Sequence, residues 1–239
     1  KDPTLFTKYK GEHSARNQIN YANPEAMQTY TKQVLEFIKD KKFISFVGTW
    51  GRDGGKGYGD DTLADPNLIV NAIAKMAIEI GKVRPDVNIE FLAYTKHDLT
   101  APDFKLPKNM SVLYCPNLNL DDEVKTENLS KWVEAAKNSQ GVNKFEYRTA
   151  DNWRLRANTT VLPEFAANLV KTHVQSGVRG MISLYLPTDS WIRASMNFAF
   201  IQHETWEGEG DGMNSPETIK QLDRMLTTQF PLYGSEFSE

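Results

Sequence analysis

Strand-like and helix-like segments alternate along this chain, and that alternation constrains its fold more than any other feature of the sequence. Short apolar, β-branched runs are followed by longer segments whose apolar residues recur at helical spacing. The expected strands begin near residues 18, 43, 88, 111, 143 and 180. The expected helices lie near residues 24–38, 67–83, 127–138, 162–175, 191–205 and 216–229, with Asn23 expected to cap the first and Pro24 to lie in its first turn. Such alternation is typical of a parallel sheet whose strands are joined by crossover helices.

The number of strands points to part of a barrel. A closed (β/α)8, or TIM-type, barrel has eight strands, and the sequence predicts six. The segment from Lys1 to Ala15 is too short for two further βα units. We therefore expect an α/β protein in which residues 1–239 form a single domain, the C-terminal part of a (β/α) barrel, supplying about six of its βα units. Upstream strands or domains of a larger natural protein would complete it. The alternative is an open, doubly wound sheet.

Composition and spacing exclude several functional classes. Lys and Arg total 28 against 31 Asp and Glu, so the formal net charge of −3 gives no general attraction to a polyanion. Nucleic acid is therefore not an expected partner. No apolar run approaches the ~20 residues that would span a membrane. The four histidines lack HxH or HExxH spacing, so neither a metal nor another cofactor is expected. The single cysteine, Cys115, excludes an internal disulfide.

Aromatic residues stand where the expected strands end. In both architectures ligands bind at the carboxyl ends of parallel strands. A sugar stacks its C–H face on an aromatic ring and needs polar partners for its hydroxyls. We therefore expect these rings to bind carbohydrate, and the alternative is that each packs in the core, since strands favour aromatics. The five residues are Trp50, Tyr94, Tyr114, Tyr147 and Tyr185.

The loop of residues 50–61 has the composition of a site loop. It contains five glycines, two basic residues and three acidic residues. Glycines allow a backbone to approach a ligand closely, and Asp53, just beyond the strand, is placed for acid/base chemistry or sugar binding. The loop lacks the Gly-Lys-Ser/Thr of a phosphate loop. The alternative is a surface loop whose charges are solvated.

Hydrolysis of a glycosidic bond needs two carboxyl groups. Asp53 is the first candidate, and its partner stays open among Asp98, Asp151 and Glu146. Glu146 shares a strand face with Arg148, so it is alternatively half of a structural ion pair. Further residues expected to bind substrate on the same rim are Arg52, Lys96, Arg148, Trp153, Asp189 and Trp191. The basic members of this set favour an acidic sugar such as a uronic acid.

Several short segments, taken in order, carry a family resemblance. They are Asn23-Pro24-Glu25, Trp50-Gly-Arg-Asp53-Gly-Gly, Val70-Asn71-Ala-Ile-Ala74, Arg84-Pro85-Asp86, Phe91-Leu-Ala-Tyr94, Gly177-Val-Arg-Gly180, Asp189-Ser-Trp191 and Phe230-Pro-Leu-Tyr-Gly234. Together they resemble the bacterial family DUF4838, whose members look like glycoside hydrolases related to α-glucuronidases. The resemblance implies a TIM-type barrel in a larger extracytoplasmic protein, periplasmic or secreted, that degrades polysaccharide. It also implies that Asp53 occupies the family's Asp-Gly position.

The chain departs from that family in two places. The stretch from Lys56 to Asp65 lacks the cysteine cluster that members often carry, and Leu184 to Thr188 lacks an expected acidic residue. We therefore predict a glycoside hydrolase-like protein acting on polysaccharide or oligosaccharide, in which Tyr94, Tyr147 and Trp191 line a subsite. The alternatives are a non-catalytic carbohydrate-binding barrel and a scaffold fragment without activity of its own.

Overall fold

The structure is a computed structural model that describes residues 2–9, 11–14, 17–51, 65, 67–94, 99–116, 122–146, 163–183 and 224. The chain divides into two compact units. One comprises Lys1–Phe145 with Ser176–Ile182, and the other comprises Glu146–Gln175 with Ser183–Glu239. The helices expected at 191–205 and 216–229 lie outside the described residues.

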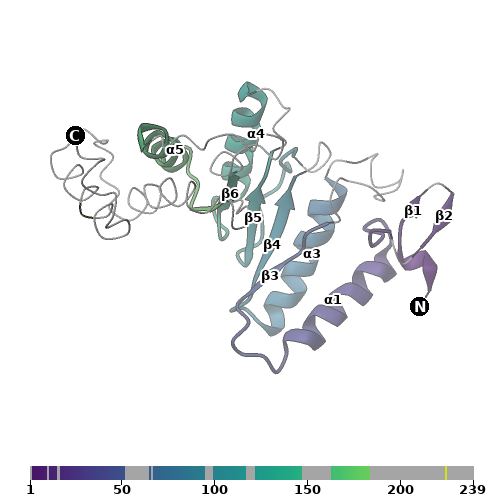
Figure 1. Cartoon of the computed structure of the whole chain (residues 1–239). Helices are drawn as coiled ribbons and strands as arrows, with labels where there is room; N and C mark the ends of the chain where they lie inside the picture. Colours follow the sequence, from purple (N-terminus) through teal and green to yellow (C-terminus); the bar gives the residue numbers. More distant parts are fainter. Residues whose placement is uncertain are drawn as a thin grey trace, which may run out of the picture. The chain divides into compact units, whose positions relative to one another are not determined.

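Five strands form the main sheet of this α/β fold (Figure 1). Their order in the sheet is the order of the chain, and the pairs from β3 to β6 are parallel. A doubly wound sheet reverses its strand order at a switch point, whereas these five described strands never reverse. Sequential order is the order of strands in a (β/α) barrel. The strands are β3 (Phe46–Gly48), β4 (Asn88–Ala93), β5 (Met110–Tyr114), β6 (Val142–Glu146) and β7 (Gly180–Ser183).

Helices follow the pattern that the sequence predicts. The described ones are α1 (Pro24–Ile38), α3 (Leu68–Val83), α4 (Asp122–Ala135) and α5 (Pro163–Gln175). Asn23 caps α1, because its Oδ1 accepts the backbone N–H groups of Glu25 (2.9 Å) and Ala26 (3.3 Å). Within the described residues, no helix has both the length and the apolar character needed to cross a bilayer.

The core lies between one face of the sheet and the helices of the first unit. The buried stripe of α3 includes Ile73, Met76 and Ile80, which repeat at helical spacing. Trp132 of α4 is fully buried, and its ring lies 5.5 Å from that of Phe91 in β4. Its indole N–H donates to the backbone oxygen of Leu99 at 2.9 Å. Trp132 therefore fastens α4 to the sheet by packing and by a buried hydrogen bond.

The first expected strand is not part of the sheet. Residues 18–21 make only an isolated antiparallel bridge, between Ile19 and Phe6. Their backbone groups bond to the N-terminal segment, with Thr7 N donating to Gln18 O and Asn20 N donating to Leu5 O, both at 2.9 Å. This segment lies beside η1 (Pro3–Leu5) and the hairpin of β1 (Lys8–Tyr9) and β2 (Glu12–His13). The prediction of a sixth parallel strand there was wrong, because these bonds satisfy the backbone locally.

The second expected strand is shorter and more exposed than predicted. A short apolar, β-branched run such as residues 43–50 is typical of a strand buried on both faces, but only β3 forms, at the edge of the described sheet. Phe43 is 84% exposed and Phe46 is 48% exposed. An edge strand lacks a neighbouring strand on one side. Its apolar side chains therefore remain exposed to solvent where a second neighbour would have covered them.

Arg84 fixes the approach to β3 and β4. Its guanidinium donates to the backbone oxygens of Ile38 at 2.6 Å and Ile44 at 2.9 Å, and it pairs with Asp86 at 2.7 Å. One side chain therefore ties the end of α1, the lead into β3 and the turn before β4. Pro85 and Asp86 form the turn between α3 and β4.

Candidate functional site

The two faces of the sheet differ in chemistry. Ile89, Phe91 and Ala93 of β4 belong to the core on the helix side. Strand alternation places Asn88, Glu90 and Leu92 on the opposite face. The register carries this second face across the sheet, since Gly48 pairs with Glu90, Glu90 with Ser111, and Leu113 with Asn143. Polar side chains are therefore gathered on the face that would line the interior of a barrel; we call it the inner face.

A buried carboxyl group lies at the centre of the inner face. Glu90 is fully buried. The indole N–H of Trp50 donates to Glu90 Oε1 at 3.3 Å, and the amide Nδ2 of Asn143 donates to Glu90 Oε2 at 3.3 Å. Trp50 is 51% exposed, so one ring joins a buried acid to the surface at the carboxyl end of β3.

Burial controls the protonation of Glu90. Removal from water raises the pKa of the Glu90 carboxyl above its usual value, and the hydrogen bonds from Asn143 and Trp50 offset part of that rise. No salt bridge in the described part of the chain gives Glu90 a cationic partner, so its charge is balanced only by N–H dipoles there. A carboxyl group in this setting holds its proton more tightly than an ordinary glutamate does.

A second polar contact lies nearer the start of β4. Asn88 Nδ2 donates to the hydroxyl oxygen of Ser111 at 2.7 Å. The Oδ1 of Asn88 is buried and accepts no hydrogen bond. The Asn88–Ser111 contact does not involve Glu90, so the described part of the inner face holds two separate groups of hydrogen-bonded side chains.

Three of the residues expected at the rim are described. Trp50 and Tyr94 follow their strands, and alternation puts both on the side of Glu90. Tyr114 lies on the helix side, where it is fully buried and its hydroxyl donates to the backbone oxygen of Lys125 at 2.9 Å. Burial raises the pKa of the Tyr114 phenol. Tyr114 is therefore a core residue, as in the alternative considered for each of these aromatic residues.

The other predicted site residues lie outside the described residues, so the roles expected for them stay predictions. They are Arg52, Asp53, Lys96, Asp98, Tyr147, Arg148, Asp151, Trp153, Tyr185, Asp189 and Trp191.

Glu146 pairs with a histidine. Its Oε1 lies 2.9 Å from Nε2 of His173 in α5, and both residues are buried. Because residues 143 and 146 differ by an odd number of positions along β6, Glu146 and Asn143 lie on opposite faces of that strand. Glu146 therefore does not share the inner face with Glu90, which weakens it as the second carboxyl of a glycosidase.

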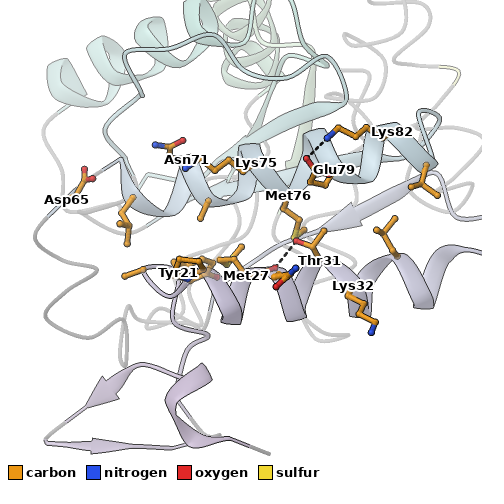
Figure 2. A pocket seen from close by; sticks show the side chains of 17 residues that line it. Tyr21, Met27, Thr31, Lys32, Asp65, Asn71, Lys75, Met76, Glu79 and Lys82 are labelled. Carbon is orange, nitrogen blue, oxygen red and sulfur yellow. Dashed lines mark hydrogen bonds and ion pairs between the residues drawn. The ribbon is translucent and has the colours of Figure 1, made fainter.

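A groove of about 720 Å³ lies between α1 and α3 (Figure 2). Met27, Leu35 and Met76 contribute apolar surface, and Lys82 pairs with Glu79 at 2.6 Å beside it. The groove is on the helix side of the sheet, so it is separate from the inner face and from Trp50.

Sequence reasoning missed Glu90 and Asn143. A usable signal was present, because Glu90 interrupts the apolar strand Asn88–Ala93, where an unpaired charge is costly. Asn143 carried no such signal, since its importance depends on strand register.

The described residues contain no group of three or more His, Cys, Asp or Glu side chains that could bind a metal ion.

Comparisons of the chain with protein-family models, with curated proteins and with solved structures found no match. The candidate site is therefore defined by the geometry around Trp50 and Glu90.

Proposed function

We propose that this chain is a carbohydrate-active protein of glycoside hydrolase type, built on a (β/α) barrel, whose ligand stacks on Trp50. The observation that carries the proposal is the half-exposed indole at the carboxyl end of β3, anchored by the buried Glu90. Ligands of parallel α/β sheets bind at this end of the strands. A fixed aromatic plane beside polar groups is the usual surface for a sugar ring.

Asp53 is the carboxyl that we propose for catalysis, with Asp98 or Asp151 as its partner. Asp53 follows Trp50 by three residues in the sequence, so we expect it near the same strand end. Arg52, Lys96 and Arg148 would select an acidic sugar, and a uronic acid is the substrate class that they fit best.

A non-catalytic carbohydrate-binding barrel is the second candidate. One observation favours it: the carboxyl group that the described inner face does contain, Glu90, is fully buried and has no exposed surface with which to touch a ligand. Such a protein would keep the stacking ring and lack the carboxyl pair.

We also propose that further strands extend the sheet beyond β3. In a parallel strand alternate residues bond to each neighbour, and Asn88 N donates to Ser45 O while Thr49 N donates to Glu90 O. Phe46 and Gly48 therefore turn their backbone groups to the open side. Upstream segments of the same natural protein, an extracytoplasmic one by its resemblance, would supply these strands.

Replacing the ring tests the function. Trp50→Ala is expected to weaken binding of uronide oligosaccharides about fivefold, since a stacking contact contributes about 1 kcal/mol. Calorimetric titration with uronide and neutral oligosaccharides measures this. Phe43→Ala is the control, because Phe43 is an aromatic residue that is more exposed than Trp50 and precedes β3 instead of following it, and it should bind as the unaltered chain does.

Turnover separates the two candidates. Release of reducing ends by the unaltered chain, lost in Asp53→Asn, supports a hydrolase. Binding without turnover in both proteins supports the binding barrel. Failure to bind any of the oligosaccharides, or equal binding by Trp50→Ala and the unaltered chain, contradicts the proposal.

A further inference from the structure

A line of contacts crosses the inner face from β7 to the end of β3. It passes from Gly180 to Asn143, from Asn143 to Glu90, and from Glu90 to Trp50, with both hydrogen bonds at 3.3 Å. These residues come from four different strand segments, and no two of them are neighbours in the sequence. The line ends at the exposed ring.

Two glycines make room for the ends of this line. A β-carbon at Gly48 would lie 3.1 Å from Trp50 Nε1, a tight contact, so a side chain at that position would require the indole to shift by a few tenths of an ångström. A β-carbon at Gly180 would lie 2.8 Å from Asn143 Oδ1, which is closer than such contacts normally allow. Gly180 thus leaves the space in which the Asn143 amide turns toward Glu90.

Strand β5 lies between the donor Asn143 and the acceptor Glu90. Asn143 is on β6 and Glu90 is on β4, so their side chains meet across β5. On the inner face of β5, Ser111 is in register with Glu90 and Leu113 is in register with Asn143, so the bond runs diagonally past these two side chains. The Ser111 side chain is small and accepts a hydrogen bond from Asn88.

We propose that Asn143 and Glu90 are positioning residues that set the orientation of the Trp50 ring, and that Gly180 allows Asn143 to do so. Each carboxyl oxygen of Glu90 accepts one hydrogen bond, from Trp50 or from Asn143, and both bonds are long at 3.3 Å. Loss of the Asn143 bond would let the carboxyl group turn, and the indole would lose its partner. The effect on sugar affinity rests on the proposed function, whereas the effect on the ring does not.

The indole N–H resonance of Trp50 in an NMR spectrum of the full chain tests the proposal. Trp50→Phe identifies the resonance, and Trp132 provides an internal reference because its N–H donates to Leu99 O instead. In Asn143→Ala and in Glu90→Leu the Trp50 resonance is expected to move and its exchange with solvent to accelerate about fivefold, as for the loss of one ordinary hydrogen bond. The Trp132 resonance should stay in place, which shows that the variants are folded.

Three further variants sharpen the test. Glu90→Gln keeps one oxygen for the indole but presents an NH2 group to Asn143, so the Trp50 resonance should move less than in Glu90→Leu. Asn88→Ala is the matched control, because it removes a polar side chain from the same face without touching Glu90. Gly180→Ala should reproduce the Asn143→Ala result.

A Trp50 resonance that is unchanged in Asn143→Ala overturns the proposal, even if Glu90→Leu moves it. Sugar titrations of the same variants provide the second arm: Asn143→Ala should bind more weakly than Asn88→Ala. If the unaltered chain binds no carbohydrate, only the proposed function fails, and the indole resonances still decide the positioning roles.

Discussion

Trp132→Ala is expected to lower the free energy of unfolding by about 3–5 kcal/mol, the range measured for removal of a large buried aromatic side chain. The substitution leaves a cavity beside Phe91, deletes the ring contact at 5.5 Å, and leaves the backbone oxygen of Leu99 without its 2.9 Å donor. Because Trp132 joins α4 to the sheet, little nearby structure can collapse into the space. Urea unfolding followed by circular dichroism measures the loss.

Val124→Ala is the matched control for that experiment. It shortens an exposed apolar residue on the same helix, so the stability should change by no more than about 0.5 kcal/mol. A loss below about 1 kcal/mol for Trp132→Ala would contradict the packing described for α4.

Glu90→Gln is expected to stabilise the protein at neutral pH by roughly 1–3 kcal/mol, the scale of the cost of burying an incompletely compensated polar group. Burial raises the pKa of the Glu90 carboxyl in the folded state above its usual 4.5. An acid of this kind binds its proton more tightly when folded, so stability falls as the pH rises from the unfolded pKa through the folded pKa. The full cost is present above that window, and below pH 4.5 it vanishes.

The difference between Glu90→Gln and the unaltered chain should therefore be largest at pH 7–8 and disappear near pH 4. Urea midpoints measured across this range test the sign. Glu134→Gln is the control, since Glu134 is exposed and its pKa is lowered by the hydrogen bond and charge of Lys105. A Glu90→Gln protein that is less stable than the unaltered chain at both pH values would show that Glu90 is a stabilising charge.

Local patterns predicted the described helices and most of the described strands. The apolar spacing of α3 and the cap at Asn23 are properties of neighbouring residues, so the sequence alone determines them. The runs that form β4 and β5 were recognised for the same reason. Residues 18–21 have a similar strand-like character, but the partner that they bond to is Leu5–Thr7, which no local pattern identifies.

The candidate site could be predicted only in part. Trp50 was found because it follows a strand end, which is a local property. Its link to Glu90 spans 40 residues, and the link from Glu90 to Asn143 spans 53, so both depend on the register of strands that the sequence does not specify. Tyr114 shows the converse, because one step in strand alternation moves a terminal aromatic from the inner face to the core.

We propose that carbohydrate stacks on Trp50 where β3 ends. The sharpest test is titration of the full chain with a uronide oligosaccharide, followed by the indole N–H resonances. We expect a saturable shift of the Trp50 resonance, with the Trp132 resonance unmoved. Saturable binding measured by calorimetry while the Trp50 resonance stays in place would contradict it.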